Sequence, residues 1–214
     1  MIEYCGKQIP QTLPELVKPS HTALLVVDIQ NEFCVKDGRI IFPEILSRLK
    51  DLVGVARQCD VMVLHMQDTI DYRHDSAPRI RNYMRTHNVD NPHKLPIRAV
   101  DGTWGHKFVD GFGPVGHEPI IKKYTSSAFK GTSLDMFLRN AGIKTTVIAG
   151  VVTHGCVWST ARDASYDYFA VVVSDCVASQ KEELHEASLR WMKLTSDVAD
   201  SEDIARVWRE ATDN

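Results

Sequence analysis

Cys156 is the side chain in this sequence best placed to act as a nucleophile, within the segment GVVTHGCVWSTARDA. An apolar run ends at Gly150, and a tight turn then brings the cysteine to the expected start of a helix. A thiol at a helix N-terminus meets unpaired backbone N–H groups and the positive end of the helix dipole, which favour the thiolate. The same N–H groups can stabilise the oxyanion that forms when a carbonyl carbon is attacked. We therefore interpret Cys156 as a nucleophile rather than as a buried core cysteine.

The other cysteines lack this strand-to-helix setting and are interpreted as structural residues: Cys5, Cys34, Cys59 and Cys176. Five cysteines without paired spacing predict free thiols rather than disulfides. Neither a CxxC pattern nor a Cys/His finger pattern occurs. The cysteines therefore give no indication of a zinc site.

Asp28 and Lys123 each stand where a short apolar run ends. A carboxylate at the mouth of a buried strand is poorly solvated, which raises its pKa and suits it to accept and return a proton. A lysine among strand ends can hold Asp28 ionised and lower the pKa of a nearby thiol. Taken singly, these residues have plainer interpretations as a turn aspartate and a surface lysine. Lys122 should point to the opposite side of its strand and is the less suitable lysine.

Short apolar runs rich in branched residues predict the strands that must position these side chains. The first, residues 22–27 (TALLVV), is typical of a strand covered on both faces. Similar runs occupy residues 61–65, 145–149 and 170–173, and residues 119–122 (PIIK) form a shorter candidate.

Segments with helical spacing alternate with these runs, at residues 44–57, 133–140 and 181–193, and another helix should begin near Cys156. Strands alternating with helices imply right-handed crossovers, a mostly parallel sheet and helices on both faces. The predicted fold class is therefore an α/β protein, a three-layer α/β/α sandwich. Ligands in such folds bind beyond the carboxyl ends of the strands, which selects Asp28, Gln67, Lys123 and residues 151–156.

Composition predicts one globular domain over residues 1–214 that binds a small molecule. Hydrophobic residues make up 43% of the chain, and the net charge of -3 offers no field that would attract nucleic acid or an anionic membrane. The N-terminus has no apolar run long enough for a signal peptide, and no segment is as apolar as a membrane span. We therefore expect a cytoplasmic location.

Residues 69–117 interrupt the alternation with a long polar and aromatic stretch. A structureless loop of this length is unusual in a compact domain. We predict a short helix near residues 78–85, followed by an irregular excursion over the strand ends. Both a substrate-covering segment and a plain surface insertion are compatible with this stretch.

Three segments together resemble the isochorismatase-like, or cysteine hydrolase, family. They are LLVVDIQNEF at residues 24–33, IIKKYTSSAFKGTSLDMFLRNAG at residues 120–142 and VIAGVVTHGCVWSTARDA at residues 147–164. The segments occur in the order and spacing of the family, and the resemblance spans nearly the whole chain.

The resemblance implies a catalytic triad of Asp28, Lys123 and Cys156. It also implies a cis peptide bond between Val151 and Val152, and an oxyanion site built from the N–H groups of Val152 and Cys156. Family members tend to form dimers or tetramers, and the apolar positions Ala205, Val207 and Trp208 are compatible with a docking helix.

Within the family, the sequence is most similar to the carbamoyl and ureido amidohydrolase branch, which implies a small linear amide or ureido substrate. Nicotinamidases carry an Asp-x-His metal pattern soon after the second strand, and this chain has QDTID there, without that pattern. The resemblance therefore implies no metal and no cofactor, and it ranks a nicotinamidase low. Isochorismatases need no cysteine nucleophile, so Cys156 favours acyl chemistry. The alternatives kept open are an isochorismatase-type or nicotinamidase-type hydrolase and a non-catalytic thiol sensor on the same fold.

The sequence also predicts substrate-contacting residues in addition to the triad. Phe33 follows Asp28 and offers an apolar wall, although packing in the core explains it equally well. The other candidates are Gln67 at the end of the second strand, Trp104 in the long excursion, and Thr153 and His154 in the nucleophile turn.

Overall fold

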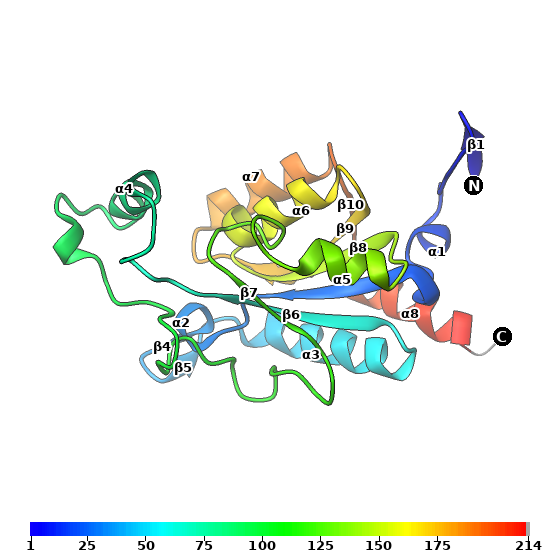
Figure 1. Cartoon of the computed structure of the whole chain (residues 1–214). Coiled ribbons are helices and arrows are strands. Elements are labelled where there is room, and N and C mark those ends of the chain that lie inside the picture. Colours follow the sequence, from blue (N-terminus) through cyan, green and yellow to red (C-terminus); the bar gives the residue numbers. More distant parts are fainter. Residues whose placement is uncertain (213–214) are drawn as a thin grey trace.

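The computed structural model describes residues 1–212 and is built around one six-stranded sheet (Figure 1). All neighbouring strands in this sheet pair in parallel, in the order β10-β9-β8-β3-β6-β7. The strands are β3 (Thr22–Val27), β6 (Met62–Asp68), β7 (Ile120–Lys123), β8 (Thr145–Val151), β9 (Phe169–Ala178) and β10 (Asp197–Ala199). The predicted parallel sheet is confirmed, and it is parallel throughout.

Strand β3 lies at the centre of the sheet, paired with β6 on one side and β8 on the other. All six of its residues are buried. Leu24 and Val26 face one hydrophobic core, and Leu25 and Val27 face the other. A strand covered on both faces has no solvated side, which explains why its sequence is continuously apolar.

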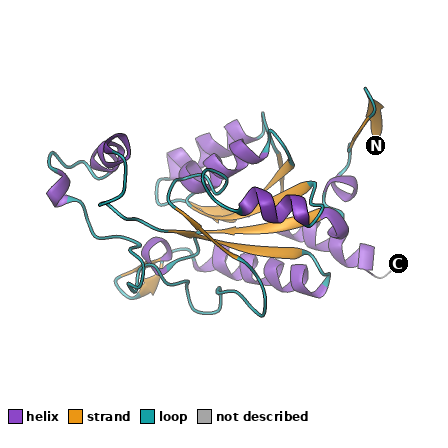
Figure 2. Ribbon diagram, in the orientation of Figure 1, coloured by secondary structure: helices purple, strands orange, loops and turns teal. Residues whose placement is uncertain are grey.

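Helices cover both faces of the sheet and complete three layers (Figure 2). The first face is packed by α1 (Leu13–Leu16), α3 (Pro43–Gln58) and α8 (Ser201–Thr212). The second is packed by α5 (Leu134–Asn140), α6 (Trp158–Ala164) and α7 (Glu182–Met192). Both cores are built from the apolar stripes of these helices, so the predicted α/β/α sandwich is confirmed.

Helix α8 belongs to the core of this chain. Ala205, Val207 and Trp208 are buried, and the indole N–H of Trp208 donates a hydrogen bond to the carbonyl of Val17 at 2.8 Å. A buried tryptophan needs such a partner for its N–H group. The interpretation of these three residues as a subunit-docking face is therefore wrong, because they pack against their own chain.

Several short elements lie outside the predicted pattern. Two antiparallel hairpins flank the sheet, β1 (Ile2–Tyr4) with β2 (Lys7–Ile9) and β4 (Val35–Lys36) with β5 (Arg39–Ile40). Edge strand β10 is too short to be recognised by its apolar residues alone. The remaining short helices and turns are η1 (Pro19–His21), α2 (Asn31–Cys34), η2 (Pro92–Lys94) and η3 (Thr153–Val157).

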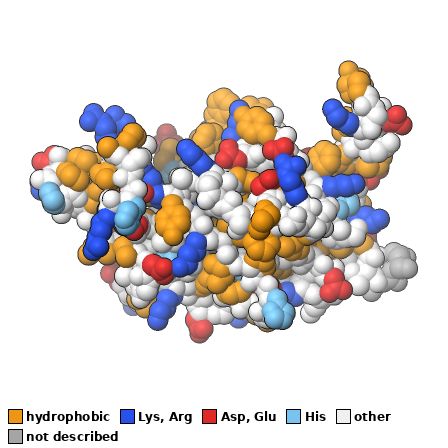
Figure 3. Space-filling model, in the orientation of Figure 1, with side chains coloured by type: hydrophobic (Ala, Val, Ile, Leu, Met, Phe, Trp, Pro, Cys, Tyr) orange, Lys and Arg blue, Asp and Glu red, His pale blue; other side chains and the backbone are white. Residues whose placement is uncertain are grey.

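The long excursion after β6 contains the predicted helix, α4 (Ala77–Thr86), which stands beyond the carboxyl ends of the strands, apart from the sheet (Figure 1). Further along, the chain returns to the strand ends, where Gln30 and Phe108 form an isolated antiparallel bridge. Acidic and basic side chains are interspersed over the face of the molecule in Figure 3. No helix within residues 1–212 is both long and apolar enough to cross a lipid bilayer.

Candidate active site

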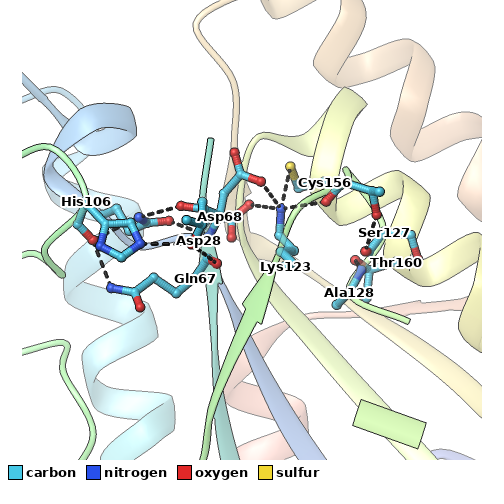
Figure 4. Close-up of polar contacts among 12 residues, drawn as sticks. Asp28, Gln67, Asp68, His106, Lys123, Ser127, Ala128, Cys156 and Thr160 are labelled. Carbon is cyan, nitrogen blue, oxygen red and sulfur yellow. Dashed lines mark hydrogen bonds and ion pairs between the residues drawn. The ribbon is translucent and has the colours of Figure 1, made fainter. Parts of the chain in front are cut away.

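Four segments that are distant in sequence meet at the carboxyl ends of the strands (Figure 4). Asp28 follows β3, Asp68 ends β6, Lys123 ends β7, and Cys156 lies in the π-helical turn η3 after β8. Parallel strands end at one edge of the sheet, so the fold brings these side chains together.

The ammonium group of Lys123 is the centre of the cluster. Its Nζ lies 2.8 Å from Asp28 Oδ2 and 3.0 Å from Asp68 Oδ1. It also donates to the carbonyl of Thr125 at 3.2 Å and to Cys156 Sγ at 3.2 Å. The side chain is fully buried, and a buried ammonium requires such compensation. The fold therefore brings the predicted trio of Asp28, Lys123 and Cys156 together.

Lys122 lies on the other side of β7, as strand alternation predicts. Its Nζ contacts Asp101 Oδ2 at 2.7 Å, and the residue is exposed. Only Lys123 therefore reaches the buried cluster.

Asp68 is the member of the cluster that the sequence interpretation missed. Strand β6 extends to Asp68, three residues beyond the predicted run, and Asp68 pairs in register with Lys123 on β7. Residues directly opposite each other on neighbouring strands project to the same face, so this register joins the carboxylate to the ammonium. An acidic residue three positions after an apolar run was the available signal, but the choice between Gln67 and Asp68 required the register.

Burial controls the protonation of Asp28. Loss of solvation raises the pKa of the carboxyl to about 6, against the opposing attraction of Lys123. The negative charge of Asp68 adds to this rise. Asp28 is thus a base near neutral pH that becomes a carboxylic acid under mildly acidic conditions.

Burial raises the pKa of the Cys156 thiol as well, and Lys123 offsets this rise only in part because Asp28 and Asp68 both oppose thiolate formation. Burial alone lowers the pKa of Lys123, but its interactions with Asp28, Cys156 and Asp68 raise it well above its usual value. The resting cluster therefore holds a neutral thiol, two carboxylates and one ammonium. The expectation that the helix N-terminus favours a resting thiolate is not met here, because burial and then the charges of Asp28 and Asp68 raise the pKa of the thiol.

Backbone geometry around the nucleophile depends on one glycine. Gly150 has φ +127°, and an added Cβ would lie 2.1 Å from the carbonyl oxygen of Val27. Only glycine therefore allows β8 to pass so close to β3 at the strand ends. The peptide bond between Val151 and Val152, which follows shortly after, is cis, as the resemblance implies.

Helix α6 anchors the segment that follows Lys123. Ser127 Oγ donates to the carboxylate of Asp163, and the N–H of Ala128 donates to Thr160 Oγ1 at 3.1 Å (Figure 4). These bonds fix the loop that supplies the Thr125 carbonyl to the ammonium, so α6 positions both the nucleophile turn and the lysine.

A cavity of about 540 Å³ opens above the cluster, and Asp28, Asp68 and Cys156 form part of its wall. Its volume suits a small molecule. The cavity is also lined by the predicted residues Phe33, Val152 and His154 and by residues from the long excursion: Ile70, Tyr83, Thr86, His87 and Arg98. Part of residues 69–117 therefore does reach the site.

Three predicted substrate contacts do not line this cavity. Gln67 points away and donates its Nε2 hydrogen bond to the carbonyl of His106 at 2.9 Å. Trp104 is 59% exposed, and its carbonyl accepts a bond from Asn31. Thr153 is buried with its Oγ1 2.8 Å from His185 Nδ1. Each of these predictions is corrected, because residue position along a strand or turn does not determine which way the side chain points.

Metal-binding side chains do not gather at the site. Among residues 1–212, no group of three or more His, Cys, Asp or Glu side chains is arranged to hold a metal ion. His74 Nδ1 and Asp71 Oδ2 are 2.7 Å apart as an exposed pair outside the cavity.

Comparison with known proteins agrees with this geometry. The profile of the isochorismatase domain matches residues 22–203. The chain is 29% identical over 177 residues to a ureidoacrylate amidohydrolase RutB of Rhizobium rhizogenes, covering 76% of this chain and 72% of that protein. It is 35% identical over 184 residues to a probable inactive nicotinamidase of Arabidopsis thaliana, covering 81% and 88%.

Among solved structures, an isochorismatase-like hydrolase from Alkaliphilus metalliredigens matches with a TM-score of 0.74 and 30% identity, covering 87% of this chain and 98% of that chain. N-carbamoylsarcosine amidase from Thermoplasma acidophilum matches with a TM-score of 0.68 and 27% identity, covering 84% and 96%. The chain therefore belongs to the isochorismatase family and is a hydrolase.

Proposed function

We propose that the protein is a cysteine-dependent amidohydrolase that cleaves a C–N bond of a small linear amide, carbamoyl or ureido compound. The observation that carries this proposal is the buried ammonium of Lys123, which lies 3.2 Å from Cys156 Sγ and 2.8 Å from Asp28 Oδ2. Relatives named ureidoacrylate amidohydrolase and N-carbamoylsarcosine amidase support the choice of C–N bond.

Acylation begins from the neutral thiol. As Cys156 Sγ attacks the carbonyl carbon, Asp28 accepts the thiol proton, and Lys123 remains charged beside both groups. Asp28 then returns that proton to the departing nitrogen, the C–N bond breaks, and an amine or ammonia leaves with a thioester on the enzyme. Coupling the proton transfer to attack avoids a resting thiolate next to two carboxylates.

Deacylation uses Asp28 a second time. The carboxylate takes a proton from water, the resulting hydroxide attacks the thioester, and the C–S bond breaks. Cys156 recovers a proton, and the acid product leaves. In both steps the proposed donors to the oxyanion are the backbone N–H groups of Val152 and Cys156. Both residues line the cavity.

A redox-sensing role for Cys156 is less well supported. Sensor cysteines react as thiolates of low pKa, and burial beside two carboxylates raises the pKa of this thiol. Asp28 and Lys123 serve an acyl transfer and have no role in thiol oxidation.

The test is ammonia release from maleamate, ureidoacrylate, N-carbamoylsarcosine, biuret and nicotinamide. Wild-type protein should release ammonia from at least one compound, and Cys156→Ala should abolish this release without loss of the folded state by circular dichroism. Cys5→Ala is the matched control, because Cys5 is an exposed free thiol and its removal should leave the rate unchanged. Turnover by Cys156→Ala at the wild-type rate would refute the assignment of Cys156 as nucleophile. No ammonia release by wild-type protein from any of the five compounds would refute the proposed substrate class.

A further inference from the structure

The walls of the cavity differ in charge from its floor. At the floor, Asp28 and Asp68 share one ammonium, that of Lys123, so the buried cluster carries a net negative charge. The two cationic side chains on the wall, Arg98 and Lys181, come from the long excursion and from the start of α7. Because Arg98 is paired with Glu32, Lys181 supplies the net positive charge of the wall opposite this negative floor.

Arg98 is held in place by groups that leave part of its guanidinium free for a ligand. Its Nε donates to Glu32 Oε1 at 2.8 Å, and its Nη1 donates to His87 Nε2 at 3.2 Å. The guanidinium also stacks over the ring of Phe33, with its carbon 5.5 Å from the ring centroid. A guanidinium has five N–H donors in a rigid fork, and these contacts use two of them.

Lys181 is a cation without a counter-charge. The residue lines the cavity at its solvent-exposed edge, and no carboxylate within residues 1–212 forms an ion pair with it. The adjacent Glu182 and Glu183 are exposed and do not line the cavity. An unpaired ammonium at the edge of a cavity favours an anionic ligand over a neutral one.

Two imidazoles complete the wall without adding charge at neutral pH. Burial lowers the pKa of His87, and the nearby charge of Arg98 lowers it further. Burial likewise lowers the pKa of His154, with Lys181 acting in the same direction. The charge of Lys181 therefore acts on an imidazole of the excursion and on one of the nucleophile turn.

We infer that Arg98 and Lys181 form a carboxylate-binding subsite, so that the substrate is a short amide or ureide that carries a carboxylate away from the scissile bond. The negative floor repels this carboxylate and the wall attracts it, which orients the molecule with its amide carbon toward Cys156. The identity of the scissile bond rests on the proposed function, whereas binding of a carboxylate at the subsite can be measured without any reaction.

Matched pairs of ligands test the subsite: maleamate against its neutral diamide maleamide, and succinamate against succinamide. Calorimetric titration into Cys156→Ala measures binding without turnover. The acid of each pair should bind more tightly than the diamide, and added salt should reduce the preference. Lys181→Met should weaken binding of the acids by about 10- to 100-fold, as loss of a charge-assisted hydrogen bond does. Binding of the diamides should change less than about twofold.

Lys94→Met is the matched control, because Lys94 lies in the same excursion, pairs with Asp90 and does not line the cavity. It should leave binding of all four ligands unchanged. Arg98→Lys keeps the charge facing Glu32, so a folded variant with weakened acid binding would show that the guanidinium fork matters.

Equal binding of acid and diamide, binding of neither, or an unaltered preference in Lys181→Met would overturn the subsite. Selective binding of the acids by Cys156→Ala, together with no ammonia release by wild-type protein, would instead overturn the proposed reaction and keep the subsite.

Discussion

Replacing Asp28 by asparagine should inactivate the protein and at the same time stabilise it at alkaline pH. The change keeps the size of the side chain and removes both its negative charge and its ability to accept a proton. Lys123 does not become an unpaired buried charge, because its ammonium still contacts Asp68 Oδ1 at 3.0 Å and the carbonyl of Thr125 at 3.2 Å. The usual penalty for breaking a buried ion pair is therefore reduced.

The expected gain follows from the pKa of Asp28, which burial raises from 3.8 to about 6. A difference of one in pKa corresponds to about 1.4 kcal/mol, so ionised Asp28 costs the folded state about 3 kcal/mol. Because the folded chain binds the proton more tightly than the unfolded chain, this cost is fully present above a pH of about 6. It declines as the pH falls toward 3.8, and below that value Asp28 is protonated in both states.

Two assays measure the outcome. Urea unfolding near pH ~8 should give Asp28→Asn a free energy of unfolding that is about 1 to 3 kcal/mol higher than that of wild type, and the difference should vanish near pH ~4. Loss of the general base should reduce kcat for ammonia release at least about a hundredfold. In wild type, kcat/KM should rise with pH through about 6, as Asp28 ionises.

The reasoning fails if Asp28→Asn is less stable than wild type at alkaline pH. The attraction between Asp28 and Lys123 would then exceed the cost of burying the carboxylate. A stability difference that does not vary with pH would refute the raised pKa of Asp28. Turnover by Asp28→Asn within about tenfold of wild type would refute the role of Asp28 as a base.

Other substitutions test the remaining features of the structure. Asp68→Asn removes a negative charge that raises the pKa of Asp28, so the rise of kcat/KM should move to lower pH, and an unmoved profile would contradict the coupling. Gly150→Ala places a Cβ 2.1 Å from a backbone oxygen and should prevent folding. Gly54→Ala is the matched control, because Gly54 lies inside α3 with open space around it, and this change should raise the free energy of unfolding by about 0.5 to 1 kcal/mol. Trp208→Ala should cost about 3 to 5 kcal/mol in denaturant unfolding, and a small loss would show that α8 is not part of the core.

Local sequence determined most of the fold. Buried strands such as β3 must be apolar on both faces, so each can be located in the sequence as a continuous run of apolar residues. Helix α3 places Leu49, Val53 and Ala56 on one buried stripe, which is visible as spacing in the sequence. The three motifs behind the resemblance pointed to Asp28, Lys123 and Cys156, because each of these residues lies within a short segment that can be read from the sequence.

Tertiary structure alone decided which neighbours those residues have. Asp68 belongs to the cluster, and Gln67 does not, because the register of β6 against β7 places Asp68 opposite Lys123, and adjacent residues of a strand point to opposite faces. Likewise, the pKa of the Cys156 thiol is raised by its burial and by Asp28 and Asp68, against the opposing charge of Lys123, and these groups come from different segments. Strand propensity and motif spacing are local properties, whereas register, burial and electrostatic coupling depend on distances that exist only after the chain has folded.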